Sequence, residues 1–258
     1  MELIEGDLNS RASLDRALQG AYGVFGVTDF WEHGFEAEVR QGKTLVDAAV
    51  DARVQHFVFN SVGGVDRTEG LAIAHFDSKR AIEAHLRRGG LAATVFRPVT
   101  FLENFVSRRI RKAVCVDGVF RFCIRPSTPF QMVAMHDVGA FVAKAFAEPG
   151  VYADRAMEIA SVRVTMLEFV AALASALGRP VRYECLGPAL QWVIAAYVQV
   201  TGTSGRYKVG PSLIAQFRWN NASPAGGWDA DIEALRRLHP GLMTIREWMA
   251  SVNWRAGL

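Results

Sequence analysis

The alternation of short apolar runs with helix patterns limits the fold more than any other feature of this sequence. Runs rich in valine and phenylalanine occupy residues 21–28 (AYGVFGVT), 55–60 (QHFVFN) and 92–97 (AATVFR). Between them, apolar residues recur at helical spacing over residues 34–53, and a second helix pattern ends at the Gly89-Gly90 pair. Strands that alternate with helices form parallel sheets covered on both faces by right-handed crossovers. We therefore expect an α/β protein with a doubly wound parallel sheet.

After residue 100 the sequence changes character. Helices are expected at about 101–112, 136–146 (with His136-Asp137 as its cap), 165–177, 188–200, 211–219, 229–238 and 244–252, and short strands near 118–133, 156–159 and 181–184. No stretch rich in proline and serine separates the two halves. We predict a sheet-bearing domain over residues 1–134 and a smaller, mostly helical lobe over residues 135–258 that packs on it.

The charge and cysteine content exclude several classes of protein. The 258 residues carry 29 basic and 26 acidic side chains, a net charge of +3, so no nucleic-acid partner is expected. Cys115, Cys123 and Cys185 lack CxxC spacing, which predicts reduced thiols and neither a disulfide framework nor a metal site. No apolar run approaches the ~20 residues that span a bilayer. We expect a soluble, cytoplasmic protein that does not contact membranes.

A doubly wound sheet usually binds a dinucleotide through a glycine-rich turn, and this sequence lacks such a turn. GxGxxG after the first strand places a pyrophosphate on a helix N-terminus, yet no strand of this sequence is followed by that motif. Residues 2–5 predict a short strand that matches the third strand of the order 3-2-1-4-5-6. We therefore predict that a glycine-rich β-α-β unit lies upstream of Met1. Without that unit, residues 21–28 form an apolar edge strand and nucleotide binding is impaired.

Six stretches, in order along nearly the whole chain, carry a family resemblance: GDLNSRASLDRALQGAYGVFGVTDFWE, EVRQGKTLVDAA, VQHFVFNSV, HFDSKRAIEAHLR, FRPVTFLENF and DADIEALRRLHPGLMTIREWM. The sequence resembles the NmrA-like family, an atypical branch of the short-chain dehydrogenase/reductase superfamily. This resemblance implies a Rossmann-like domain that binds NADP, with NAD as the alternative. The family includes regulators and redox sensors that bind the nucleotide, and its related branches include reductases of quinone and phenolic compounds.

The resemblance also implies where the nucleotide would be held. The implied contacts are Asp7 and Leu8 near the adenine, Thr28, Asp29 and Phe30 after the strand at 21–28, Lys79, and Phe101, Leu102, Glu103 and Asn104 around the nicotinamide. Relatives often have Thr-Asn-Tyr or Thr-Asn-Phe where this chain has Thr-Asp-Phe. The added carboxylate of Asp29 is a departure from the family pattern.

The segment His75-Phe76-Asp77-Ser78-Lys79 raises the question of catalysis. In ordinary short-chain dehydrogenases, a tyrosine four residues before the lysine donates a proton and a serine polarises the carbonyl. Here Lys79 is present and Ser61 stands where the serine belongs, but His75 replaces the tyrosine.

Three interpretations remain open. Lys79 anchors the nucleotide of a redox sensor or regulator with little turnover. Alternatively, His75 or Lys79 is the acid/base of an NADPH-dependent reductase of a quinone or carbonyl compound, since imidazole titrates near neutral pH and a buried lysine can serve as a base. In the third interpretation these are surface residues and the chain is a protein-interaction module without nucleotide. A protein partner and an oligomeric state stay open.

Overall fold

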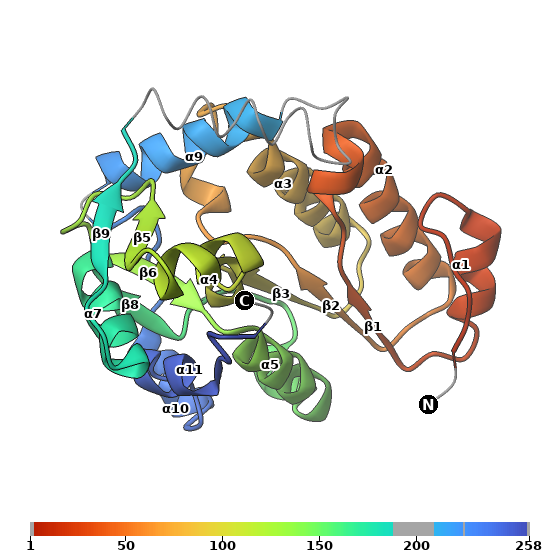
Figure 1. The fold of residues 1–258 in the computed structure, drawn as a ribbon. Helices are drawn as coiled ribbons and strands as arrows, with labels where there is room; N and C mark the ends of the chain where they lie inside the picture. The colour runs from red at the N-terminus through yellow and green to blue at the C-terminus, as the bar shows by residue number, and fades with distance from the viewer. Residues whose placement is uncertain (1–2, 188–208, 224, 257–258) are drawn as a thin grey trace.

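A four-stranded parallel sheet forms the centre of the molecule (Figure 1). The computed structural model describes residues 3–187, 209–223 and 225–256. The strands are β1 (Gly23–Gly26), β2 (His56–Asn60), β3 (Ala93–Pro98) and β7 (Arg155–Ile159), in the order β1-β2-β3-β7. The three apolar runs of the first hundred residues supply the first three strands, so the expected α/β parallel sheet is confirmed.

Helices cover both faces of this sheet (Figure 1). On one face lie α2 (Phe30–Asp51) and α3 (Ala74–Arg88), and on the other lies α5 (Met135–Ala147). The two helices of the first face pack closely because α2 presents Gly42 to Ile82 of α3, where an added Cβ would lie 2.4 Å from Ile82 Cδ1. A side chain larger than hydrogen at this position would push the two helices apart.

Strand β1 forms an edge of the sheet. Its side chains alternate between Val24, which is buried against α2 and its neighbours, and Phe25, which is 43% exposed. Val27, just beyond the strand, is 48% exposed on the same side. The strand expected at residues 2–5 is wrong, because residues 3–5 have no strand assignment and Leu3 is 94% exposed. No described strand offers this segment the backbone partners that a strand needs.

The part after residue 100 adds two small sheets. One contains β4 (Thr100–Phe101), β6 (Phe130–Val133) and β8 (Val162–Val164), and the other pairs β5 (Val119–Phe122) with β9 (Arg182–Cys185). The sequence did not predict β8, which pairs antiparallel with β6. The helix expected at 101–112 is divided into the 3-10 turn η2 (Leu102–Phe105) and α4 (Arg108–Cys115), because Ser107 caps a new helix by accepting from the Ile110 N–H.

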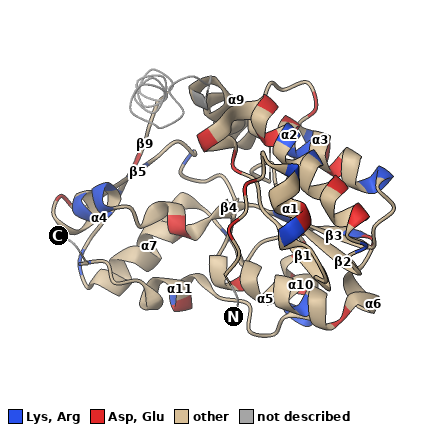
Figure 2. Ribbon diagram, turned by 90° about the vertical axis from the view of Figure 1, so that its right-hand side faces the viewer, with Lys and Arg blue, Asp and Glu red and all other residues tan. Residues whose placement is uncertain are grey.

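The remaining helices are α1 (Arg11–Ala17), η1 (Val65–Arg67), α6 (Pro149–Tyr152), α7 (Met166–Leu177), α9 (Val209–Ala222), α10 (Ile232–Leu238) and α11 (Ile245–Ser251). The helix expected at 188–200 lies outside the described residues. Capping boxes fix the start of α7 at Thr165 and Glu168 and of α11 at Thr244 and Glu247. Figure 2 shows α4 as a basic helix. Its buried residue is Val114.

The cap expected at His136-Asp137 is wrong. The N-cap of α5 is Ala134, and Asp137 lies in the first turn with its side chain fully buried. Its carboxylate accepts from Ser161 Oγ and from the Met243 N–H. The aspartate therefore ties α5 to two distant loops, which is a long-range role that a local sequence pattern does not show.

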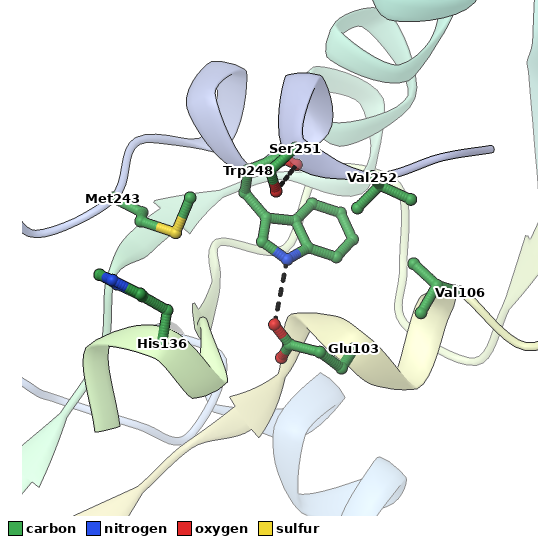
Figure 3. A pocket seen from close by; sticks show the side chains of 7 residues that line it. All are labelled: Glu103, Val106, His136, Met243, Trp248, Ser251 and Val252. Atoms are coloured by element: carbon green, nitrogen blue, oxygen red, sulfur yellow. Dashed lines mark hydrogen bonds between the residues drawn. The ribbon is translucent and has the colours of Figure 1, made fainter. Parts of the chain in front are cut away.

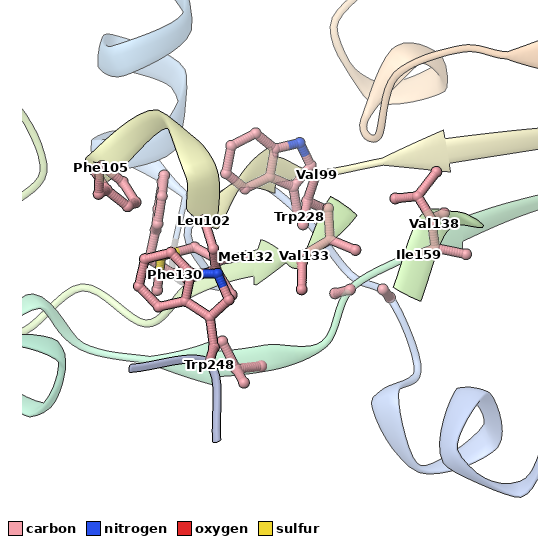
Figure 4. Packing of buried hydrophobic residues seen from close by; sticks show 14 of the residues in the cluster. Val99, Leu102, Phe105, Phe130, Met132, Val133, Val138, Ile159, Trp228 and Trp248 are labelled. Carbon is pink, nitrogen blue, oxygen red and sulfur yellow. The ribbon is translucent and has the colours of Figure 1, made fainter. Parts of the chain in front are cut away.

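One hydrophobic core runs through both halves of the chain. The same buried cluster contains Phe96 of β3, Phe141 of α5 and Trp248 of α11. Figure 4 shows part of it, including Phe130 and Trp228, whose ring centroids are 4.9 Å apart. Strand β7 lies beyond the boundary expected at residue 134 yet pairs with β3. The central sheet therefore draws on both sides of that boundary.

Candidate functional site

A cavity of about 430 Å³ lies where the central strands end. Its walls include Thr28 after β1, Ser61 after β2 and Val99 after β3. The start of α3 and three residues of α9, Leu213, Gln216 and Phe217, also line it. The carboxyl ends of parallel strands meet at one edge of a sheet, and ligands of open α/β folds bind at that edge. The topology therefore makes this cavity the candidate site.

Aromatic side chains supply much of the cavity wall. They come from six separate segments of the chain: Phe30 and Trp31, Phe76, Phe101 and Phe105, Phe122, Phe217, and Trp228. Such a wall suits a flat, apolar ring system, since aromatic pairs stack with offset or edge-on geometry.

Lys79 lines the cavity and is held by buried partners. Its Nζ donates to the Thr28 carbonyl oxygen (2.8 Å) and to Thr28 Oγ1 (2.7 Å), and it lies 2.7 Å from Glu38 Oε1. Glu38 is fully buried and also accepts from Thr28 Oγ1 and Ser78 Oγ. An ammonium has three protons to donate, so these contacts occupy all of them.

His75 lies one helical turn before Lys79, and its ring is enclosed. Ser212 Oγ lies 2.6 Å from Nδ1 and Gln216 Oε1 lies 2.9 Å from Nε2, both side chains coming from α9. Burial is the main cause that lowers the pKa of His75 to about 4, and the nearby charge of Lys79 also lowers it. The hydrogen bond with Gln216 acts in the opposite direction and raises the pKa. Burial therefore favours the neutral imidazole at pH 7, and side chains of α9 engage both of its ring nitrogens.

Ser61 is turned toward a buried ion pair. Its Oγ donates to Glu83 Oε1 at 2.5 Å, and Arg97 donates to both oxygens of the same carboxylate at 3.0 and 2.7 Å. Burial lowers the pKa of Arg97, but hydrogen bonds and charge from Glu83 and Asp66 raise it above its ordinary value. The hydroxyl proton of Ser61 is therefore directed away from the cavity.

The sequence matches the NmrA-like family over residues 1–249. The chain belongs to the NmrA-like family. One relative of this NmrA-like protein is the (4-alkanoyl-5-oxo-2,5-dihydrofuran-3-yl)methyl phosphate reductase of Streptomyces griseus, which is 32% identical over 192 residues. The aligned part is 72% of this chain and 63% of that reductase, so the chain spans less than two thirds of its relative.

Solved structures of similar fold include a triphenylmethane reductase from Citrobacter sp. in complex with NADP(H), at 18% identity and a TM-score of 0.78. The superposition covers 97% of this chain and 82% of that one. NmrA, a negative transcriptional regulator solved in complex with NADP, is 21% identical with a TM-score of 0.76, over 97% and 80% of the two chains. At these identities the likeness shows that the NmrA-like protein shares their fold.

Most of the residues predicted for the site of this NmrA-like chain are brought together. Those that line the cavity are Thr28, Asp29, Phe30, Ser61, His75, Lys79, Phe101 and Asn104. The departure at Asp29 has a local explanation, because its carboxylate caps α2 by accepting from the N–H groups of Trp31 (2.7 Å) and Glu32 (3.3 Å).

Four predicted residues lie elsewhere in the NmrA-like chain. Leu102 is fully buried in the core. Glu103 lines a separate cavity of about 260 Å³, where it accepts from Trp248 Nε1 at 3.2 Å (Figure 3) and from the Met135 N–H at 3.1 Å. Asp7 and Leu8 precede α1, where the Asp7 N–H donates to Ser13 Oγ at 2.9 Å. None of the four belongs to the cavity wall.

Sequence reasoning missed Glu38, Ser212 and Gln216. Glu38 had a detectable signal, because it falls on the same helical face as Gly42, Leu45 and Ala49, where a carboxylate is costly unless paired. The two residues of α9 had none, since they meet His75 across 137 and 141 positions of sequence.

Within the described residues, no group of three or more His, Cys, Asp or Glu side chains is arranged to hold a metal ion. In the same part of the chain, no helix combines the length and the hydropathy that crossing a bilayer requires.

Proposed function

We propose that this chain binds NADPH or NADH in the cavity and that the site reduces a conjugated acceptor by hydride transfer. The observation that carries the proposal is the position of the cavity at the carboxyl edge of β1, β2 and β3, with Lys79 in its wall. Its volume of about 430 Å³ falls in the ordinary range of small-molecule sites. The aromatic wall suits the ring of a nicotinamide and the ring of an acceptor.

The cofactor, when bound, supplies the hydride, and the residues of this chain position the partners. Lys79 binds the sugar nearest the nicotinamide by exchanging one of its Thr28 contacts for a sugar oxygen. Glu38 keeps the ammonium in place during that exchange. Phe101 and Asn104 contact the nicotinamide side, and the aromatic wall excludes water from the hydride path.

The acceptor class follows from the missing proton donor. His75 is neutral with both ring nitrogens engaged, Ser61 donates to Glu83, and the three Lys79 protons are occupied. A simple ketone needs a proton as the hydride arrives, whereas a quinone or an enone spreads the new charge and takes its proton later. The reductase from Streptomyces griseus, at 32% identity, is named for a conjugated lactone and supports this class.

The same shortage of proton donors favours a second candidate, a nucleotide-binding redox sensor or regulator without turnover. NmrA, whose fold this chain shares, is a negative transcriptional regulator in complex with NADP. The two candidates have the same binding site and differ only in whether an acceptor is reduced.

Binding is tested by titrating the chain with NADPH and with NADH and following energy transfer from the cavity tryptophans Trp31 and Trp228. We expect the double variant Lys79→Met/Glu38→Gln, which removes the buried charges together, to weaken binding about ten- to a hundredfold, as for a lost charged hydrogen bond. Lys112→Met, on the exposed face of α4, is the matched control and should bind as the parent does.

Turnover is then measured as oxidation of NADPH with a quinone. Oxidation that the double variant loses supports the reductase. Binding without oxidation supports the sensor. Absence of both binding and oxidation contradicts the proposed site and leaves a protein-interaction module.

A further inference from the structure

We infer that Gln216 is a catalytic hydrogen-bond donor, and that its amide nitrogen binds the oxygen of the acceptor while His75 and Ser212 hold the amide in orientation. This inference rests on the proposed hydride transfer and names the residue that replaces a proton donor at the same site.

Gln216 presents one end of its amide to the protein and the other to the cavity. The side chain lines the cavity, and its Oε1 lies 2.9 Å from His75 Nε2. Among the described residues, the amide nitrogen has no protein acceptor, and it is not one of the enclosed polar atoms without a partner. Gln216 is 9% exposed and lines the cavity, so a ligand in the cavity lies beside its side-chain amide.

The orientation of the amide follows from the hydrogen bonds around His75. Ser212 Oγ accepts from the His75 backbone N–H at 3.4 Å, so its own proton is free to donate to Nδ1 at 2.6 Å. Nε2 lies 2.9 Å from Gln216 Oε1, and an amide oxygen can only accept, so this arrangement requires the ring proton on Nε2 and leaves Nδ1 as the acceptor. Nε2 donates to an oxygen, which places Oε1 of Gln216 toward the ring and the NH₂ group away from it.

The ring itself is held firmly. Its centroid lies 4.8 Å from that of Trp31 and 4.8 Å from that of Phe76. Burial lowers the pKa of His75 to about 4, so the ring stays neutral across the neutral pH range. A donor fixed in this way loses little freedom when the reaction occurs, which is the property that makes oxyanion donors effective.

The role in the reaction requires no proton from the protein. The hydride adds to the β-carbon of the conjugated acceptor, the C=C electron pair forms a new double bond to the carbonyl carbon, the carbonyl π pair moves onto oxygen, and the nucleotide leaves oxidised. Gln216 Nε2 donates a hydrogen bond to that oxygen as its charge grows. Water later supplies the proton that completes the product.

The test uses the isosteric variant Gln216→Glu, whose carboxylate still accepts from His75 but cannot donate. With a quinone as acceptor, we expect kcat/KM to fall about a hundredfold, the usual loss of an oxyanion donor, while NADPH affinity changes by less than about threefold. Arg218→Gln, on the exposed face of the same helix, is the matched control.

A second acceptor separates catalysis from structure. A cationic triarylmethane dye accepts hydride at carbon without forming an oxyanion, so Gln216→Glu should reduce the dye at the parental rate or faster. An equal loss with both acceptors, or no loss with the quinone, overturns the inference. A parent protein that binds no nucleotide or reduces neither acceptor instead contradicts the proposed function.

Discussion

The imidazole of His75 is buried between α2, α3 and α9, and it replaces the residue from which a proton would be expected. Its native pKa of about 4 lies below the ordinary value of 6.5. The unfolded chain therefore binds this proton at a higher pH than the native chain. It follows that His75 lowers stability as the pH falls from 6.5 toward 4 and has no such effect above 7.

This shift predicts a measurable loss of stability in acid. The free energy of unfolding should fall by roughly 3 kcal/mol between pH 7 and pH 4 through this one residue. Urea unfolding at a series of pH values checks it, with His75→Gln as the comparison, because glutamine does not titrate. If both proteins show the same pH dependence, the histidine is not held neutral.

The buried ion pair between Glu38 and Lys79 leads to a second prediction, which concerns the stability of the protein. Glu38→Gln alone leaves the ammonium without its counter-charge and should destabilise the protein by about 3–5 kcal/mol. The double variant Lys79→Met/Glu38→Gln should cost at least ~1 kcal/mol less than the sum of its single variants, because the charges are removed together. Chemical denaturation of all four proteins gives this coupling, and strict additivity would mean that the two groups do not interact.

At the level of elements, the contact between α2 and α3 depends on Gly42. Alanine in a helix is ordinarily about 1 kcal/mol better than glycine. At this position, however, the added methyl meets Ile82, so Gly42→Ala should destabilise the protein by about 1–3 kcal/mol. Ile82→Val removes the nearest atom, Cδ1, and should recover part of that loss in the double variant.

Gly139 on α5 is the matched control for that experiment. An alanine Cβ there would have nothing within 4 Å, so Gly139→Ala should leave stability unchanged or raise it by up to about 1 kcal/mol. Thermal unfolding of both variants compares them directly. Stabilisation by Gly42→Ala would show that the helices are not in close contact.

Local sequence patterns predicted the helices and strands better than they predicted side-chain contacts between residues that are distant in sequence. The central strands could be read from the sequence because both faces of β2 are buried and its three middle residues, Phe57, Val58 and Phe59, are apolar. Helix α7 could be read from Thr165 and its capping box. Asp137 was misread as a cap because its partners, Ser161 and Met243, are distant in sequence. The site was half predictable for the same reason: Lys79 belongs to a local motif, whereas Gln216 reaches it only through the fold.

At the scale of the whole molecule, β1 is an edge strand of the central sheet that the described residues form, and this has consequences for handling in solution. An unpaired strand beside exposed apolar side chains is a template for pairing with another chain. Phe25 is 43% exposed there, so Phe25→Lys should lower light scattering by concentrated protein. Leu167→Lys adds the same charge at a 55% exposed position on α7, away from the edge, and should not. Equal effects would point to net charge alone.

Because residues of α9 line the cavity, the complete site can form only after α9 has been synthesised. Segments after β1, β2 and β3 are synthesised before Gln216 and Phe217 of α9. On the proposed function, a ligand would therefore stabilise only those chains in which α9 has already been made and folded onto the sheet.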